Sequence, residues 1–291
     1  MIKLLGTTYR LHPLFLMVMA VSLLTGYFVE LVTLFGIVVI HEWGHVAAAR
    51  SFGWKVREIQ LLPFGGVAVM DDQGQGSAWQ EIVVYLAGPM QNALMIGLSL
   101  LLQQTAVWDQ QWGNYFLESN LIIGLFNLSP ILPLDGGKIM QSLMSLWLNY
   151  YSALMFSIWT SLISSAVVIA YALAGWHSAG IRLNLLVIGC FLLYSNWFDY
   201  RNLPYLFLRF LVKREFWLSR TIGKGAEARP IVVNGGNTVS HILRRFHRNK
   251  VHIIYVLNDK GAIQGILPEH RVISGFLSDH KPGSAVSELF M

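Results

Sequence analysis

Long apolar stretches are the feature of this sequence that most limits what the chain can fold into. An α-helix needs about 20 consecutive apolar residues to cross a bilayer. Hydrophobic residues make up 54% of the chain and charged residues only 13%, too little charge to cover a soluble domain of 291 residues. The sequence therefore predicts a polytopic α-helical membrane protein with about six transmembrane helices, at residues 13–29, 31–50, 80–103, 118–149, 153–174 and 182–198.

Two segments depart from simple spans. The fourth stretch is too long and is interrupted by Pro130 and Pro133, so it predicts a broken helix that faces protein or a polar cavity. The segment IQLLPFGGVAVMDDQ, after the second stretch, contains Pro63 and Gly65-Gly66, which break any helix, followed by residues of β character. We expect a membrane-dipping β-hairpin here, with an ordinary cytoplasmic loop as the alternative.

Basic residues indicate the orientation and the domain order. They cluster before the first stretch, after the second and after the sixth, at Lys3, Arg10, Arg50, Lys55, Arg57, Arg201, Arg209, Lys213 and Arg214. Because basic loops stay on the cytoplasmic side, we expect an integral membrane protein with both termini in the cytoplasm. The predicted domains are a transmembrane domain at 1–199, a basic linker at 200–228 and a small cytosolic α/β domain at 229–291, which reads strand, helix, hairpin, helix.

The second stretch carries the strongest chemical motif, HEWGH at residues 41–45. His41 and His45 stand four residues apart, so both project from one helix face and can bind one zinc ion. Glu42 is placed to take a proton from a water molecule that attacks a peptide carbonyl. Ionisable groups inside a membrane helix are costly and seldom without a function. The motif therefore predicts an intramembrane zinc metalloprotease, with a polar patch satisfied by neighbouring helices as the alternative.

A catalytic zinc takes three protein ligands and leaves one position open. Asp135 is the best third candidate, because it lies at membrane depth in the broken fourth stretch, within NLSPILPLDGGK at 127–138. It could instead cap a restarting helix. Asn127 could hold a substrate or stabilise an oxyanion, and a structural hydrogen bond is an equal alternative.

Together, HEWGH and the later Leu134-Asp135-Gly136 resemble the site-2 protease family, whose pattern is HExxH on one transmembrane helix and LDG on another. The resemblance implies that His41, His45 and Asp135 bind zinc and that Glu42 is the general base. Two further segments are similar to family elements. Phe64-Gly65-Gly66 resembles the membrane-dipping hairpin and is expected to contact substrate, and Ala87-Gly88-Pro89-Met90-Gln91-Asn92 resembles the AGP-x-x-N element.

The whole chain is similar to the sporulation subgroup of that family, and residues 229–280 resemble one CBS (cystathionine-β-synthase) repeat. This implies a protein substrate, a membrane-associated sigma-factor precursor of the pro-sigma-K type, together with inhibitory or regulatory membrane proteins. It also implies a location in the mother-cell membrane around the forespore, a homo-oligomer, and ATP or another adenine nucleotide at the CBS-like domain. Membrane lipids are expected partners and nucleic acid is not. A CBS-regulated membrane transporter or metal-handling protein is the alternative function.

Overall fold

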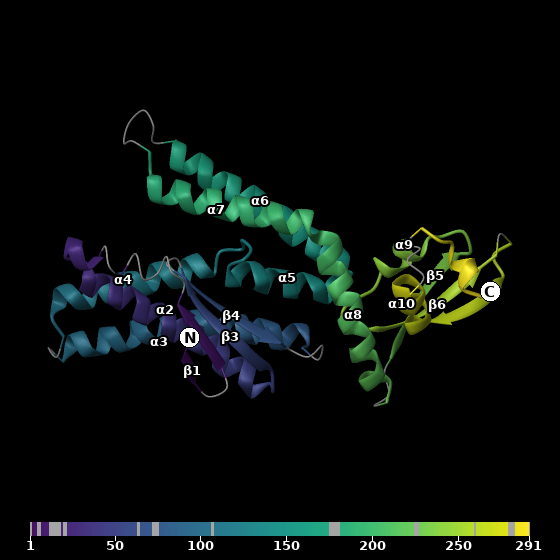
Figure 1. The fold of residues 1–291 in the computed structure, drawn as a ribbon, viewed down its shortest axis with the longest axis horizontal. Coiled ribbons are helices and arrows are strands. Elements are labelled where there is room, and N and C mark those ends of the chain that lie inside the picture. The colour runs from purple at the N-terminus through teal and green to yellow at the C-terminus, as the bar shows by residue number, and fades with distance from the viewer. Residues whose placement is uncertain are drawn as a thin grey trace. The chain divides into compact units, whose positions relative to one another are not determined.

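The computed structural model describes residues 2–4, 7–11, 19, 22–62, 65–71, 76–105, 108–174, 181–223, 227–258, 260–278 and 283–290. The chain forms two compact units, Met1–Ile139 and Met140–Met291. The first unit combines helices with a four-stranded sheet. The second combines a helical pair, a further long helix and a three-stranded sheet (Figure 1).

The helices of the first unit are α2 (Phe28–Ser51), α3 (Ala78–Gln104) and α4 (Gln110–Asn127), and α5 (Asp135–Trp147) begins in it. Small residues let α2 and α3 approach closely: a side chain at Gly44 of α2 would collide with the backbone of Ala87 in α3. At the start of α3, Ser77 and Gln80 form a capping box that satisfies two free backbone N–H groups. The two helices are thus packed backbone to backbone near HEWGH.

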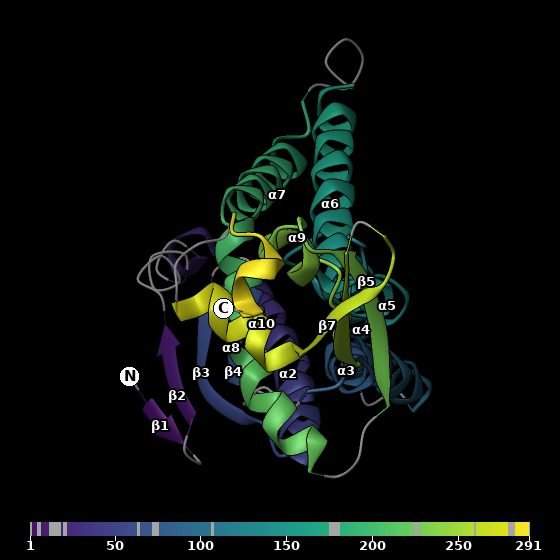
Figure 2. The ribbon, with the colours of Figure 1, turned by 90° about the vertical axis from the view of Figure 1, so that its right-hand side faces the viewer.

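The sheet of the first unit has the order β1 (Ile2–Leu4), β2 (Thr7–Leu11), β3 (Lys55–Leu62) and β4 (Gly65–Asp71) (Figure 2). Strands β3 and β4 form an antiparallel hairpin, which confirms the predicted hairpin; its depth in a membrane stays a prediction. Strands β1 and β2 were not predicted, and β2 pairs in parallel with β3. Both β3 and β4 contact α2, so the hairpin lies beside the helix that carries HEWGH.

The predicted broken helix is confirmed, because α4 ends at Asn127 and α5 restarts at Asp135. The second, third, fifth and sixth predicted spans correspond to α2, α3, α6 (Tyr150–Leu173) and α7 (Leu183–Arg201). The first, at 13–29, is described only in part, at residue 19 and from residue 22 on. Within the described part of the chain, α2, α3 and α6 are the helices long and apolar enough to cross a membrane. The full count of six spans therefore stays a prediction.

In the second unit, α6 and α7 lie side by side (Figures 1 and 2), and α8 (Leu203–Ile222) follows after one residue. The remaining elements are β5 (Ala228–Asn234), α9 (Val239–Leu243), β6 (Val251–Leu257), β7 (Ile263–Pro268), α10 (Glu269–Ser278) and the 3-10 turn η1 (Val286–Phe290). Strand β6 is central, parallel to β5 and antiparallel to β7. The elements follow the predicted order of strand, helix, hairpin and helix. Helix α8 fills most of the segment 200–228 that was predicted as a linker, and the predicted domain boundaries stay a prediction.

Candidate metal centre

Three buried side chains converge where α2 meets the start of α5. The Nε2 atoms of His41 and His45 each lie 3.0 Å from Oδ2 of Asp135 and 3.2 Å from one another. Tetrahedral zinc with bonds of about 2 Å would hold its ligand atoms roughly 3.3 Å apart. The three donor atoms therefore have the spacing that a single zinc ion requires.

A chain of hydrogen bonds determines which nitrogen of His41 carries a proton. The Nδ2 group of Asn120 donates to the carbonyl of Phe116 at 2.9 Å, so Oδ1 of Asn120 is turned towards Asn92. It accepts from Nδ2 of Asn92 at 3.1 Å, which turns Oδ1 of Asn92 towards His41. That oxygen lies 2.5 Å from Nδ1 of His41 and can only accept. His41 must then carry its proton on Nδ1, and Nε2 presents a lone pair to the centre.

His45 is held in the same way by a backbone group. Its Nδ1 donates to the carbonyl of Val84 in α3 at 2.7 Å, which again leaves Nε2 as an acceptor. Two imidazole lone pairs and a carboxylate oxygen thus face one another, with no proton between them while both rings are neutral. Three acceptors repel one another at this distance unless a cation lies among them. The donor set fits zinc, which prefers neutral imidazoles and carboxylates.

Gly88 of α3 lies against the centre. A side chain there would collide with the Nε2 atoms of His41 and His45, so only glycine leaves this space open. Gly124 of α4 supports the same region, because a Cβ at this position would meet Cβ of Asn92 at 3.2 Å. Gly88 therefore leaves the space beside both histidines open, and Gly124 lets α4 approach Asn92.

The break between α4 and α5 positions Asp135. Gly136 and Gly137 pack directly on the backbone of residues 128–132, where any side chain would collide with carbonyl groups. The second carboxylate oxygen, Oδ1, lies 3.6 Å from Nζ of Lys138, one turn further along α5. Asp135 is the first residue of α5 and also part of the cluster.

Glu42 is buried beside these ligands and is close enough to interact electrostatically with His41, His45, Asp135 and Lys138. A carboxylate in this position can exchange a proton with a reacting group at the centre. Its role as general base stays a prediction.

The remaining predicted site residues are not among the side chains that converge at the metal centre. Asn127 ends α4, and its Nδ2 group donates to the carbonyl of Ile123 at 3.0 Å, the structural hydrogen bond that was the alternative. Gly65 and Gly66 begin β4, opposite Leu62 and Leu61 of β3, and Phe64 lies outside the described residues. Substrate contacts for these four residues stay predictions.

Sequence reasoning missed the roles of Asn92, Asn120 and Gly88. The segment Ala87–Asn92 was noted for its resemblance, but no function was assigned to its residues. A usable signal was present, because a glycine and an asparagine four residues apart share one face of α3, as His41 and His45 do on α2. No comparable signal marked Asn120.

Comparison with known proteins agrees with this geometry. Residues 29–111 match the model of peptidase family M50. The chain is 31% identical to Stage IV sporulation protein FB of Bacillus subtilis over 282 residues, which cover 97% of this chain and 96% of the relative. It is also 34% identical over 155 residues to a zinc metalloprotease of Methanocaldococcus jannaschii, covering 49% of this chain and 44% of that protein.

A solved structure is similar as well. The site-2 protease from Methanocaldococcus jannaschii matches with a TM-score of 0.53 and 28% sequence identity. The match covers 67% of this chain and 92% of that structure.

Proposed function

This chain belongs to peptidase family M50, the site-2 proteases, and from that premise we propose that it cleaves a membrane-associated sporulation sigma-factor precursor of the pro-sigma-K type. Membership of this family and similarity to zinc metalloproteases indicate that the chain is an intramembrane zinc metalloprotease. Similarity over nearly its full length to a sporulation protein supports the narrower substrate. The observation that carries the chemistry is the convergence of His41, His45 and Asp135.

In the proposed mechanism His41, His45 and Asp135 hold the zinc ion. When bound, zinc supplies Lewis-acid chemistry that activates water and polarises a peptide carbonyl. Glu42 accepts a proton from the attacking water and returns it to the leaving amine. The hydrogen bonds to Nδ1 of each histidine keep both rings in the tautomer that can bind the metal.

Substrate would be presented as an extended segment along β4. Within the described sheet, β4 is an edge strand, and an edge strand offers backbone groups to an added strand. Because β4 contacts α2, an added strand would run close to the helix that holds Glu42. Phe64, Gly65, Gly66 and Asn127 are the proposed substrate contacts.

The same proposal covers the finer expectations about the whole protein. It includes six spans with cytoplasmic termini, a location in the mother-cell membrane around the forespore, and control by inhibitory membrane proteins. The order of β5, α9, β6, β7 and α10 supports a CBS-like domain. Adenine-nucleotide binding and homo-oligomer formation are proposed for this domain.

Co-expression tests the substrate. A membrane-tethered sigma-factor precursor and an unrelated protein on the same tether would each be expressed with the wild-type chain or with Glu42→Gln. We expect cleavage only of the precursor, and only with the wild-type chain. Equal cleavage of both tethered proteins would refute the substrate while leaving the protease intact. If the wild-type chain cleaved neither tethered protein, the proposed substrate would be refuted. Cleavage by Glu42→Gln at the wild-type rate would refute the mechanism.

A further inference from the structure

Helix α8 starts directly at the end of α7, a helix with exposed apolar side chains. Asn202 ends α7 and also precedes the first residue of α8. Large apolar side chains are exposed along α6 and α7, among them Phe156, Ile163, Val167, Val187 and Phe191, as expected for residues that face lipid.

Aromatic residues lie at the end of α7 next to that junction. The ring of Tyr200 lies 5.7 Å from the ring of Trp159 and 5.9 Å from that of Trp197, measured between centroids. Tryptophan and tyrosine collect where a membrane meets water. The boundary of the bilayer is therefore expected close to residue 202, where α8 begins.

One face of α8 belongs to the core of the C-terminal α/β domain. Phe207 and Leu211 are buried in the same apolar cluster as Ile231 of β5, Val256 of β6 and Ile273 of α10. Burying large apolar side chains of both α8 and the strands and helix it packs against stabilises this packing by on the order of several kcal/mol. Helix α8 is thus an integral part of this domain.

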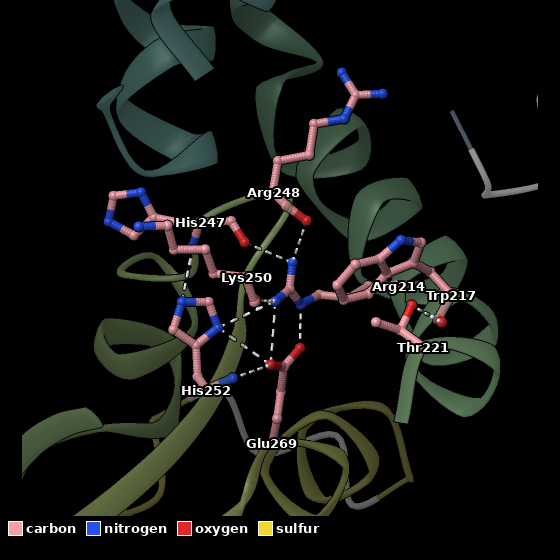
Figure 3. Close-up of polar contacts among 8 residues, drawn as sticks. All are labelled: Arg214, Trp217, Thr221, His247, Arg248, Lys250, His252 and Glu269. Carbon is pink, nitrogen blue, oxygen red and sulfur yellow. Dashed lines mark hydrogen bonds and ion pairs between the residues drawn. The ribbon is translucent and has the colours of Figure 1, made fainter. Parts of the chain in front are cut away.

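Arg214 fastens α8 to the domain from the same side (Figure 3). Its guanidinium pairs with the buried carboxylate of Glu269 at the start of α10. It also donates to the carbonyls of His247 at 2.7 Å, Arg248 at 3.0 Å and Lys250, all in the segment before β6. Arg214 and Glu269 thus form a buried, bidentate ion pair between α8 and α10. We therefore expect α8 to move together with the domain.

The opposite face of α8 is apolar, basic and exposed. Tyr205, Leu208, Val212 and the basic Arg209 stand at the i, i+3, i+4, i+7 spacing of one helix face and are all exposed, while Glu215 lies at its edge. Arg201 precedes this face and Lys213 borders it. Apolar residues mixed with lysine and arginine are typical of helices that lie in the plane of an anionic membrane.

We propose that α8 lies on the membrane surface and docks the C-terminal domain onto anionic lipid. Two observations favour lipid over a protein partner: α8 begins one residue after α7, whose exposed apolar side chains are expected to face lipid, and the positive charge of its exposed face complements anionic headgroups. This docking is independent of proteolysis. It fixes one side of the domain against the bilayer.

Depth-dependent fluorescence quenching tests the docking in the full-length chain. Cys190, the single cysteine, would be replaced by serine, and a fluorophore attached at Val212→Cys or at Val232→Cys on β5. The two valines form a matched pair, since each is 54% exposed. In liposomes containing phosphatidylglycerol, nitroxide-labelled lipid should quench the label at 212 severalfold more strongly than the label at 232.

Charge reversal provides the second comparison. Because one basic residue contributes about fivefold to binding an anionic surface, Arg209→Glu should lower lipid quenching at 212 by about fivefold or more. Arg271→Glu, an equal change at an exposed residue of α10, should leave it unchanged. Quenching at 212 no stronger than at 232 would overturn the proposal. Protection of the 212 label from aqueous iodide without lipid quenching would also overturn it, because protein would then cover this face.

Discussion

At the scale of single residues, the proposed metal centre depends on two asparagines as well as on the three side chains proposed to bind zinc. Asn92 and Asn120 determine the tautomer of His41, and the carbonyl of Phe116 determines how both amides are turned. The convergence of His41 and His45 could be predicted, because histidines four residues apart form a local pattern. The hydrogen bonds from Asn120 through Asn92 to His41 could not be predicted. These residues lie on α4, α3 and α2, far apart in the sequence, and no local spacing pattern connects them.

Asn92→Ala should weaken zinc binding by about 10–100-fold, the usual effect of removing a hydrogen bond that orients a ligand. The reason is that Nδ1 of His41 loses its acceptor and the ring can take the other tautomer. Competition titration with a zinc chelator measures the affinity. Asn92→Asp keeps an acceptor at this position and should retain most of the affinity.

Asn196→Ala is the matched control for that experiment, since Asn196 is also a fully buried asparagine but lies in α7. It should leave zinc affinity unchanged. Equal affinities for Asn92→Ala and the wild-type chain would show that the hydrogen bonds from Asn120 through Asn92 do not govern the site.

At the scale of elements, sequence reasoning succeeded where the signal was local. Pro130 and Pro133 correctly predicted the break that delivers Asp135, and Gly65-Gly66 correctly predicted the hairpin of β3 and β4. Strands β1 and β2 were missed, because short strands are stabilised by pairing with a distant partner, here β3, and not by their own residues.

Gly88→Ala should abolish zinc binding while leaving α3 helical. The added methyl group would occupy the space beside Nε2 of both histidines, whereas alanine itself favours helix. Zinc content per chain, measured by mass spectrometry on the purified protein, reports the outcome. Gly97→Ala in the same helix has no neighbour within 4 Å and should keep its zinc. A full zinc complement in Gly88→Ala would mean that the ion does not occupy this space.

At the scale of the whole molecule, the sequence indicated a membrane part and a C-terminal α/β domain but not what fastens α8 to that domain. From the sequence, Arg214 is one of several basic residues in a predicted linker. Its partner Glu269 stands 55 residues away, so their pairing could be seen only in the fold. Burial raises the pKa of Glu269, but hydrogen bonds from His252 and Arg214 lower it by more, so the pKa lies below its ordinary value.

The C-terminal domain should lose stability as the pH falls below neutrality. Burial, together with the positive charge of Arg229, lowers the pKa of His247 to about 4, and burial likewise lowers the pKa of His252. Unfolded histidines bind protons near pH 6.5, so the unfolded state takes up more protons between about pH 6.5 and about pH 4. The stability that these two histidines contribute above about pH 6.5 is therefore lost as the pH falls from about 6.5 to about 4.

Hydrogen exchange of β6 in the full-length chain, corrected for intrinsic exchange rates, measures this stability across the pH window. His247→Gln should flatten the dependence, because a neutral side chain no longer titrates. Stability that is constant or rises on acidification would contradict the assignment of these two histidines.

We propose that His41, His45 and Asp135 hold a zinc ion beside the general base Glu42. The most direct test measures zinc content and cleavage on one purified sample of Glu42→Gln, reconstituted with a tethered precursor substrate. We expect a zinc content equal to that of the wild-type chain, with cleavage slower by about 10²–10⁴-fold. Cleavage at the wild-type rate would contradict it.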